Sequence, residues 1–396
     1  MSENRKDLIL CEDFFPQVGG AHHWLYEVYK RWSEPVLLFA NDFSNCLDLE
    51  KRQAEFDNQN HGAITLVRKN LKMGDISLFD YNCIKKMYYI NGFIKKAMKN
   101  KQIILHCLRA FPEGISGMIC KSLNRQSTKL VTYAHGEEIL IAKSSRQLFL
   151  YTKYVYKHSD LVISNSKMTQ KMVLEICPEA NVVVVHPGVN FHEFQIDASK
   201  VNAQKKKWNI KQKTIILTTI ARMEERKNHA LVLRAISEII QTKKIPFLYI
   251  IASQGPEEKK LKKLAWDLGI ETHVKFTGYL SNQERILTYA ISDIHVMPSI
   301  KIGPMIEGFG IVFLEAAAAG IPSIAGKIGG QAEAVLDNKT GIVIDGTSLE
   351  KLKNAICRLA LDQQLRKTMG KEGKTWAKEN DWDIIVHKIE THVKSL

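Results

Sequence analysis

The feature of this sequence that most constrains its fold is a repeated alternation of short apolar runs with helical stretches. The apolar runs are nearly continuous, which is typical of parallel strands buried on both faces. Helical stretches such as residues 81–99 and 146–157 lie between several of them. The alternation therefore predicts an α/β fold with parallel, doubly wound sheets. The predicted strands are residues 7–11, 36–39, 63–67, 103–106, 130–133, 161–163 and 182–185, followed by 214–220, 247–252, 274–276, 293–297, 323–325 and 341–344.

The alternation is interrupted once, and the interruption divides the chain. After residue 190 a polar, lysine-rich stretch extends to Lys211, which indicates an interdomain link. The strand pattern then restarts, and a helical tail covers residues 349–396. The 396 residues are enough for two hydrophobic cores. We predict a first Rossmann-like domain over residues 1–190, a second over 191–380, and a C-terminal helix over 381–396 that crosses back to the first domain.

The formal net charge of +14 is unevenly distributed. Residues 51–150 carry 17 Lys and Arg against 7 Asp and Glu. Such a surplus suits nucleic acid, an anionic membrane surface or an anionic ligand, and it also arises from an ordinary solvated lysine-rich face. The sequence contains no DNA- or RNA-binding motif, so specific nucleic-acid binding is not expected, and a nucleic-acid-binding protein stays as a remote alternative.

The cysteines and the N-terminal residues bear on the cellular compartment. No C-x-x-C pair occurs, which favours reduced thiols over a zinc site or a disulfide framework. No apolar run approaches the roughly 18 residues of a membrane span, and residues 1–6 are polar, unlike a signal peptide. We expect a cytoplasmic protein, with peripheral attachment to the inner face of the membrane as an open alternative. The seven cysteines are Cys11, Cys46, Cys83, Cys107, Cys120, Cys177 and Cys357.

A predicted helix start in the second domain carries two glycines. The strand 293–297 is followed by a loop, and residues 314–319 are strong helix formers. Gly308 and Gly310 lie where the loop enters the helix. A helix start presents unpaired N–H groups, and glycine lets a ligand approach them closely. This stretch therefore predicts an anion-binding site.

Two carboxylates, Glu307 and Glu315, accompany that helix start. A carboxylate repels an anion, so these residues suit the neutral hydroxyls on either side of a diphosphate, as in a nucleotide sugar. Equally, glutamates near a helix start often only complement the helix dipole. The spacing alone leaves both interpretations open.

Comparable features follow other predicted strands. Gly19-Gly20 opens a helix after the first strand, which suits either a phosphate or a plain tight turn. The basic loop after strand 214–220 contains Arg222 and Lys227, and His135 follows strand 130–133. Ligands of doubly wound sheets bind beyond the carboxyl ends of strands. We therefore expect these residues to converge on one cleft if the two domains face each other.

Residues 85–101 mix basic and aromatic side chains at helical spacing. A helix of this kind can lie on an anionic membrane surface with Tyr88, Phe93 and Ile94 inserted. It can equally be a scaffold helix with an apolar inner face, and Gly92 weakens any regular helix here.

Together these residues resemble a known family. The chain is similar over nearly its whole length to the retaining glycosyltransferases of family 4, which have the GT-B fold, and most similar to the phosphatidylinositol mannosyltransferase and lipopolysaccharide or capsule glycosyltransferase branch. The most specific match is the family's Glu-x7-Glu signature, from Glu307 to Glu315. Supporting matches are Gly19-Gly20, His135-Gly136, Pro187 to Asn190, Arg222 with Lys227, Gly255-Pro256-Glu257, Phe276-Thr277-Gly278, Pro298-Ser299 and Gly329-Gly330.

The resemblance implies two Rossmann-like domains facing a central cleft, and it implies roles for single residues. Arg222 and Lys227 bind the donor diphosphate. Glu307 contacts hydroxyls of the transferred sugar, Glu315 contacts the ribose, and His135 lies beside the reacting carbon. The implied catalytic residues are His135, Arg222, Lys227 and Glu307. The implied diphosphate cradle adds Gly19, Gly20, Gly308, Phe309, Gly310, Ile311 and Val312.

The implied reaction is transfer of a hexose, with mannose favoured, from a nucleotide-diphosphate sugar such as GDP-mannose to a lipid-linked or polysaccharide acceptor in cell-envelope glycan synthesis. The alternatives are a UDP-sugar-dependent glucosyl- or N-acetylglucosaminyltransferase and a nucleotide-sugar epimerase of the same fold. No cofactor or metal is expected, and Asp381-Trp382-Asp383 favours a helix cap over a metal motif. Ala221 and Ser253 depart from family glycines, and we expect only local adjustment there.

Overall fold

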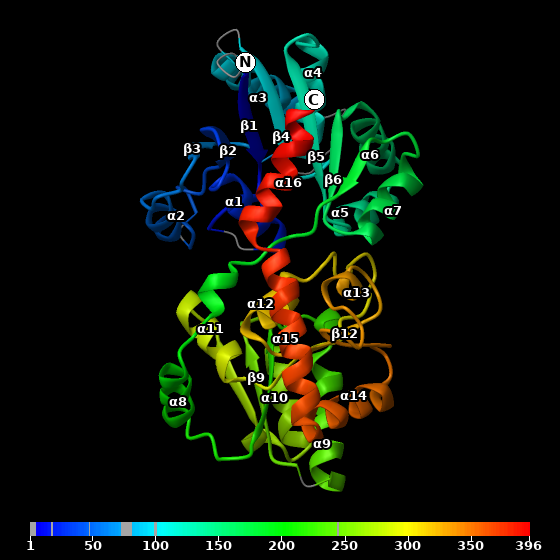
Figure 1. Ribbon diagram of the computed structural model, residues 1–396. Helices are drawn as coiled ribbons and strands as arrows, with labels where there is room; N and C mark the ends of the chain where they lie inside the picture. Colours follow the sequence, from blue (N-terminus) through cyan, green and yellow to red (C-terminus); the bar gives the residue numbers. More distant parts are fainter. Residues whose placement is uncertain (1–4, 17–18, 47, 73–80, 99–100, 244) are drawn as a thin grey trace. The chain divides into compact units, whose positions relative to one another are not determined.

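The computed structural model describes residues 5–16, 19–46, 48–72, 81–98, 101–243 and 245–396, and the chain forms two compact units (Figure 1). The first unit extends to His186 and also contains Trp382–Leu396. The second unit is Pro187–Asp381, so all of it lies in the chain between the two parts of the first.

The first unit is built on a parallel sheet whose described residues form seven strands in the order β3-β2-β1-β4-β5-β6-β7 (Figure 1). Ile9 of β1 pairs with Leu38 of β2 on one side and with His106 of β4 on the other. Ile9 has no exposed surface, as expected of a strand covered on both faces. The strands are β1 (Arg5–Cys11), β2 (Val36–Asn41), β3 (Ile64–Lys69), β4 (Gln102–Cys107), β5 (Thr128–Ala134), β6 (Leu161–Ser164) and β7 (Val182–Val184).

The helices of the first unit include the last helix of the chain. Trp382, at the start of α16, is 1% exposed and its ring meets that of His23 on α1 edge to face at 6.1 Å. The Glu390 carboxylate of α16 accepts a 2.6 Å hydrogen bond from the Ser33 amide. The helices are α1 (Gly20–Tyr29), α2 (Glu50–Asp57), α3 (Tyr81–Met98), α4 (Glu113–Leu123), α5 (Glu137–Lys143), α6 (Arg146–His158), α7 (Lys167–Ile176) and α16 (Trp382–Lys394).

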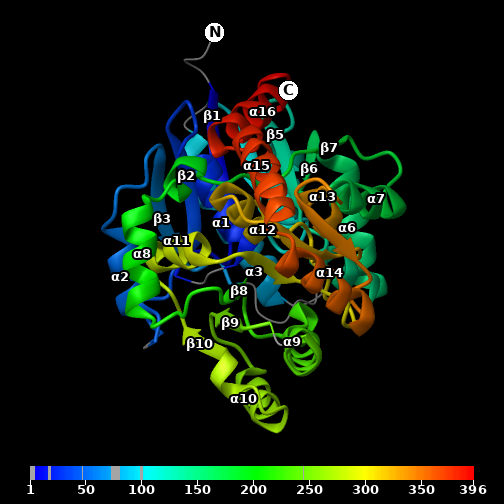
Figure 2. The same ribbon diagram turned by 60° about the horizontal axis from the view of Figure 1, so that its bottom comes forward.

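The second unit repeats this plan with six described parallel strands in the order β10-β9-β8-β11-β12-β13. Figure 2 labels the first three of these, β10, β9 and β8. His295 of β11 pairs with Thr218 of β8 and with Ser323 of β12. The strands are β8 (Ile215–Ile220), β9 (Phe247–Ala252), β10 (Val274–Gly278), β11 (Ile294–Met297), β12 (Ser323–Gly326) and β13 (Gly341–Ile344). The helices are the 3-10 turns η1 (Phe191–Phe194), η2 (Glu225–Lys227) and η3 (Glu271–His273), with α8 (Ala198–Lys207), α9 (His229–Lys243), α10 (Glu258–Asp267), α11 (Asn282–Ile291), α12 (Ile311–Ala319), α13 (Gln331–Ala334), α14 (Leu349–Leu361) and α15 (Gln363–Glu379).

Three neighbouring strands of the second sheet, β8, β11 and β12, end at the same edge. The loops that follow them are residues 221–228, 298–310 and 327–330. Because the sheet is parallel, these three loops lie together beyond the carboxyl ends of the strands. The β11 loop leads into α12, which packs against α15 (Figure 1).

The α/β prediction and the positions of all the predicted strands are confirmed, whereas the predicted interdomain link is wrong. The stretch before Lys211 contains η1 and α8, and both belong to the second unit. Val201 and Trp208 pack against a small core cluster, so this lysine-rich segment buries one side. Its lysines gather in the last turn of α8, where positive charge complements the helix dipole.

The predicted membrane helix is corrected in part. α3 continues through Gly92, Ile94 is fully buried, and Phe93 packs on Phe39 with ring centroids 4.6 Å apart. Phe93 and Ile94 therefore face the core of the first unit, while Tyr88 is 70% exposed. Residues 99–100 of the predicted segment lie outside the described residues. Among the described helices, none combines the length and apolar character needed to cross a membrane.

Candidate functional site

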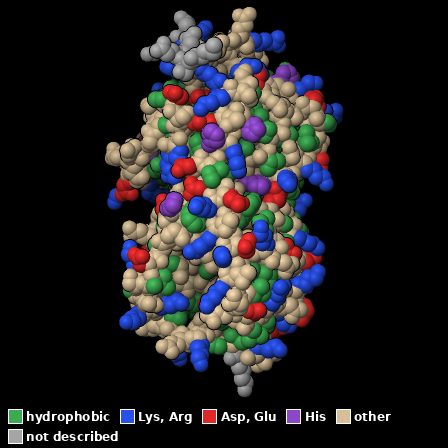
Figure 3. Space-filling view, in the orientation of Figure 1, with side chains coloured by type: hydrophobic (Ala, Val, Ile, Leu, Met, Phe, Trp, Pro, Cys, Tyr) green, Lys and Arg blue, Asp and Glu red, His purple; other side chains and the backbone are tan. Residues whose placement is uncertain are grey.

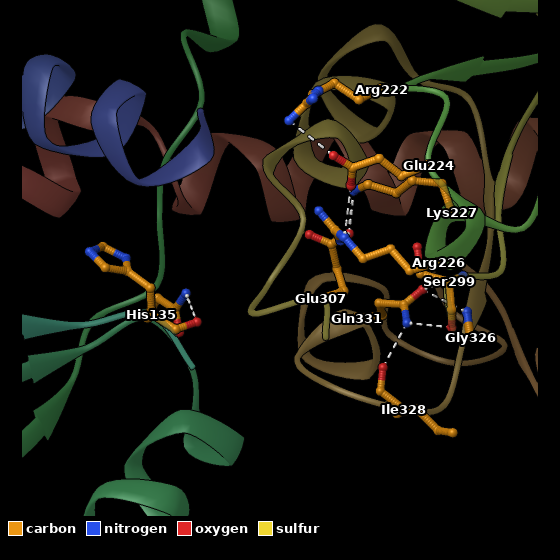
Figure 4. Close-up of polar contacts among 11 residues, drawn as sticks. His135, Arg222, Glu224, Arg226, Lys227, Ser299, Glu307, Gly326, Ile328 and Gln331 are labelled. Atoms are coloured by element: carbon orange, nitrogen blue, oxygen red, sulfur yellow. Dashed lines mark hydrogen bonds and ion pairs between the residues drawn. The ribbon is translucent and has the colours of Figure 1, made fainter. Parts of the chain in front are cut away.

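Glu307, in the loop between β11 and α12, is held by two cations of the β8 loop (Figure 4). Its Oε2 atom accepts a hydrogen bond from Arg226 Nη1 at 3.0 Å and another from Lys227 Nζ. The three side chains are only 10–15% exposed. Arg226 also donates from Nε to Glu224 at 3.0 Å. The result is a nearly buried network of two cations and two carboxylates.

Burial and charge act in opposite directions on this network. Burial opposes ionisation of Glu307, but Lys227 and Arg226 outweigh it and hold the pKa of this carboxyl below its usual value. Burial lowers the pKa of Lys227, and Glu307 opposes that shift. Glu307 is therefore an ionised hydrogen-bond acceptor at neutral pH, not a proton donor.

The β8 loop is fixed to the β11 loop through backbone and side chain. Ile300 donates from its amide to the Arg226 carbonyl at 2.8 Å. Asn228 takes a left-handed conformation with φ 61°. Its side-chain Nδ2 donates to the carbonyls of Pro298 at 3.3 Å and Gly346 at 2.7 Å. These bonds fix the backbone position of Arg226 and its neighbour Lys227, and so where their side chains lie.

Two glycines of the site have conformations or contacts that a side chain cannot accommodate. Gly310 caps α12 with φ 92°, and a Cβ there would lie 2.7 Å from the Phe313 ring. Gly330 donates from its amide to the Glu307 carbonyl at 2.9 Å, and a Cβ there would lie 2.0 Å from the Gly308 carbonyl. The loop that carries Glu307, just before α12, therefore packs closely on the turn that follows β12.

The start of α12 supplies the expected N–H groups. Ile311 and Val312 occupy its first turn, where backbone amides have no acceptor within the helix. Phe309, just before it, is 2% exposed and lies in a core cluster, so its side chain anchors the loop and only its backbone can face a ligand.

Glu315 lies more than one turn into α12 and is 6% exposed. One carboxylate oxygen pairs with Arg285 of α11, and among the described residues the other, Oε2, has no hydrogen-bond partner. Arg285 is itself fixed by Asn282 at 2.6 Å and stacks over Phe194 at 5.6 Å. This second oxygen is itself buried.

Arg222 lies at the exposed edge of this network and does not contact Glu307 directly. It is 67% exposed at its side chain, and its guanidinium pairs with Glu224 at 3.0 Å (Figure 4). The structure thus brings Lys227 and Glu307 into contact, and Arg222 reaches them only through Glu224. Sequence reasoning missed Arg226, although it adjoins Lys227 in the basic loop. It also missed Arg285, for which no local sequence signal exists.

In the first unit, His135 follows β5 and is fixed as a neutral ring. Its Nε2 donates to the Leu108 carbonyl at 3.0 Å, and its backbone amide donates to Glu138 at 2.7 Å. The ring meets Trp24 edge to face at 5.4 Å. Burial, assisted by the charge of Arg109, lowers the pKa of His135 to about 3. Because Nε2 carries the proton, Nδ1 is left as an acceptor.

A cavity of about 380 Å³ adjoins His135 within the first unit. Arg109 and Glu138 form its polar part, while Phe111 and Leu148 contribute to an apolar wall. The cavity can therefore hold a molecule that has both hydroxyl and apolar portions.

The start of α1 is open. Gly19 is the extended N-cap, and α1 begins at Gly20, which is exposed and has no atoms within 4 Å of where a Cβ would lie. His22, in the first turn, is buried, which lowers its pKa to about 4. The first-turn amides are thus approachable from outside.

The remaining singled-out residues have structural partners. Asp381 accepts from the Phe191 amide at 3.0 Å, and Asp383 pairs with Arg31 at 3.2 Å. Ser253 adopts φ 113° and donates from its amide to the Gly278 carbonyl at 2.7 Å. A serine here retains a backbone conformation that favours glycine.

Comparison with known proteins is consistent along the chain. Residues 18–193 match the model of Glycosyltransferase Family 4, and residues 200–376 match that of Glycosyl transferases group 1. Over 215 residues the chain is 34% identical to the GDP-mannose-dependent alpha-(1-6)-phosphatidylinositol monomannoside mannosyltransferase of Mycobacterium tuberculosis. That match covers 54% of this chain and 55% of the relative, so it spans about half the length of each.

Two further matches cover more of the chain. The chain is 27% identical over 315 residues to N-acetyl-alpha-D-glucosaminyl L-malate synthase of Bacillus anthracis, covering 78% of this chain and 79% of that protein. The structure resembles that of HepE from Anabaena in complex with UDP, with a TM-score of 0.81 at 19% identity, covering 99% of this chain and 100% of that one. Because the two family models together cover most of the sequence and the fold is GT-B, the chain belongs to glycosyltransferase family 4.

Proposed function

We propose that this protein is a retaining glycosyltransferase that moves a hexose, with mannose favoured, from a nucleotide-diphosphate sugar to a lipid-linked or polysaccharide acceptor. The observation that carries the proposal is Glu307, held ionised by Arg226 and Lys227 next to the start of α12. An ionised, oriented carboxylate accepts hydrogen bonds from sugar hydroxyls. The adjacent cations and amides suit the diphosphate from which that sugar is released.

Charge supports this division of roles. Breaking the bond between sugar and diphosphate builds negative charge on the leaving oxygen, and preorganised cations and amides lower that barrier. Arg226 and Lys227 are balanced by Glu224 and Glu307, and the exposed Arg222 adds one further positive charge. In this proposal Arg222 and Lys227 bind the diphosphate together with the backbone from Gly308 to Val312.

The other residues receive proposed roles by the same reasoning. Glu315, near the start of α12, is the proposed acceptor for the ribose hydroxyls. Neutral His135 offers Nδ1 to a hydroxyl beside the reacting carbon. Gly19 and Gly20 add open backbone amides at the start of α1. Since Glu307 is already engaged by two cations, a phosphate oxygen of the donor takes the acceptor proton.

The donor and the cofactor requirement are tested together. The purified protein is incubated with GDP-mannose, UDP-glucose and UDP-N-acetylglucosamine, and release of nucleoside diphosphate and the anomeric form of the product are measured by NMR. We expect GDP-mannose to be consumed with retention and without added metal, because side chains and amides meet the diphosphate charge. Turnover that EDTA abolishes and Mn²⁺ restores contradicts the metal-free proposal.

Site variants then test the assignment. Lys227→Met should lower turnover on the order of 10²- to 10³-fold, as loss of other charge-stabilising donors does. Glu315→Ala should weaken nucleotide binding. Lys260→Met, at a lysine 76% exposed on α10, is the matched control. Wild-type turnover in both Lys227→Met and Arg222→Ala would sink the assignment.

The alternative of UDP-dependent glucosyl or N-acetylglucosaminyl transfer has specific support, because HepE was solved in complex with UDP. The donor panel separates these two donors from GDP-mannose. An epimerase of the same fold would isomerise the donor without any acceptor. On the face drawn in Figure 3, Lys and Arg are dispersed among acidic and apolar side chains, so this face offers no continuous basic surface for nucleic acid.

For the acceptor side, we propose that α3 contacts an anionic membrane surface. Tyr81, Tyr88 and Tyr89 are 73%, 70% and 49% exposed, and Tyr81–Met98 carries four lysines and no acidic residue. Interfacial tyrosines and lysines favour anionic lipid. Tyr88→Ser should reduce sedimentation with vesicles containing anionic phospholipid, whereas Tyr279→Ser, at a tyrosine 69% exposed in the second unit, should not. Equal binding by both variants contradicts this contact.

A further inference from the structure

A buried glutamine lies behind the proposed donor site and has all its hydrogen-bonding capacity in use. Gln331 is the first residue of α13 and is 1% exposed. Its Oε1 accepts from the amides of Ser299 at 3.1 Å and Gly326 at 3.0 Å. Its Nε2 donates to the carbonyls of Ser299 at 3.0 Å and Ile328 at 2.6 Å (Figure 4). A side-chain amide has two donors and two acceptor sites, so this one is saturated.

These four bonds join segments that are separate in the sequence. Ser299 follows β11, whereas Gly326 ends β12 and Ile328 lies in the turn after it. A Cβ at Gly326 would lie 2.5 Å from the Ser299 carbonyl and 3.1 Å from Gln331 Nε2. The glycine thus lets two strand ends approach closely enough for one amide to bridge them.

On one side, the bridge leads to Glu307. Gly330 directly precedes Gln331, and its amide donates to the Glu307 carbonyl at 2.9 Å. A Cβ at Gly329 would lie 2.3 Å from that same carbonyl. The backbone carrying Glu307 therefore rests on the turn that the Gln331 side chain anchors.

On the other side, the bridge leads to the cations. Ser299 is held at both its amide and its carbonyl by Gln331. The next residue, Ile300, donates to the Arg226 carbonyl at 2.8 Å. The side chains of Arg226 and Lys227 meet Glu307, so one buried amide contributes to the backbone position of both partners of this ion-paired network.

We propose that Gln331 is a positioning residue: its amide sets the placement of Glu307 relative to Arg226 and Lys227. The inference rests on the proposed function insofar as Glu307 reads the transferred sugar. A displacement of about 1 Å at such a site costs on the order of 100-fold in rate. A nucleoside diphosphate still meets Lys227 but lacks the transferred sugar that Glu307 contacts, so its binding should depend on this placement less than turnover does.

The kinetic test uses Gln331→Met, which keeps the length of the side chain but makes none of the four bonds, and Gln331→Glu, which keeps the acceptors and loses the donors. We expect kcat with the nucleotide sugar that the wild type consumes to fall about 100-fold in Gln331→Met. Affinity for the matching nucleoside diphosphate, measured by calorimetry, should fall much less than kcat does, because the ribose contacts stay intact and only the contact with Lys227 is displaced.

The control is Gln53→Met, because Gln53 is a buried glutamine of the first unit that accepts from the Phe43 amide at 2.7 Å and donates to Asp42 at 2.9 Å. It should lower the melting temperature without lowering kcat. Gln331→Glu should regain activity relative to wild type as pH falls, since its protonated carboxyl can again donate one bond. Retention of kcat in Gln331→Met, or equal losses of kcat and nucleotide affinity, overturns the proposal.

Hydrogen exchange separates this inference from the reaction itself. If the wild type consumes no nucleotide sugar, the proposed function fails, but the positioning role is still decided. In Gln331→Met, which loses the acceptor of the Ser299 and Gly326 amides, we expect faster exchange at the amides of Ser299, Gly326, Ile300 and Gly330. Faster exchange confined to Ser299 or Gly326 would show that the glutamine does not support Glu307 or Arg226.

Discussion

At the residue scale, the site depends on side chains whose neighbours determine their chemistry. Glu307 is an acceptor because Arg226 and Lys227 outweigh the effect of burial on its pKa. His135 is neutral because burial lowers its pKa to about 3. Its one ring N–H donates to the Leu108 carbonyl, which leaves the other ring nitrogen as an acceptor. These states follow from surroundings that the residue types alone do not specify.

Ser253 offers a test of backbone strain at this scale. Its φ of 113° costs a non-glycine residue roughly 1–3 kcal/mol, whereas a glycine costs up to about 1 kcal/mol in unfolded-chain entropy. Ser253→Gly should therefore raise the stability of the second unit by about 1 kcal/mol, measured as melting temperature. Ser253→Ala, which keeps the Cβ, is the matched control and should give no gain. A lower melting temperature in Ser253→Gly contradicts the strain.

The sequence located some of these residues and missed others for a physical reason. Glu307, Lys227 and the helix-start glycines lie in the loops that follow β8 and β11, so their place beyond the carboxyl ends of these strands could be predicted. Arg285 and Gln331 act through contacts between segments far apart in the sequence. Arg285 is one of 56 Lys and Arg residues, and nothing in its neighbours marks it.

At the element scale, the strands were predictable because most of their residues are apolar, and central strands such as β8 and β11 are buried on both faces. The start of α12 was predictable from its glycines. Gly308 and Gly310 were predicted to lie where the loop enters the helix, and α12 begins at Ile311 with Gly310 as its left-handed N-cap. α8 was missed because its burial is slight and its outer face is rich in lysine.

Glycines inside two helices provide a matched prediction. Gly92 of α3 is exposed, and a Cβ there meets nothing within 4 Å. Gly92→Ala should therefore stabilise the first unit by up to about 1 kcal/mol through helix propensity. In α4 a Cβ at Gly117 would lie 2.7 Å from Cys107 Sγ and 2.8 Å from Leu130. Gly117→Ala should therefore destabilise by roughly 1–3 kcal/mol. Thermal melts that rank the two variants the other way contradict the packing described.

At the scale of the whole molecule, stability should depend on pH through buried histidines in both units. Burial lowers the pKa of His22 and His229 to about 4, and of His135 and His295 to about 3, from a usual value of 6.5. The unfolded chain takes up these protons below pH 6.5, while the folded units do not until about pH 4 or 3. Stability is therefore complete above pH 6.5 and is lost as pH falls toward 4.

The measurement is the melting temperature at pH 7 and pH 5. The wild type should melt at lower temperature at pH 5, and each buried histidine contributes up to about 1.4 kcal/mol per pH unit below 6.5. His295→Phe removes one such group from a site where His295 lies against Phe313 and Tyr289, so its loss between the two pH values should be smaller. His387→Phe, at an exposed position, should behave as the wild type does. Identical losses in all three proteins contradict the assignment.

The return of α16 to the first unit has a consequence for how the protein is made. During synthesis the ribosome releases β1 to β7 first, then all of the second unit, and only then Trp382–Leu396. The surface of the first unit that contacts Trp382 and Glu390 stays uncovered until α16 has been synthesised. Although domains generally fold in the order in which they emerge, here the second unit can complete its structure before the first. Helix α16 thus makes completion of the first unit depend on prior synthesis of the second.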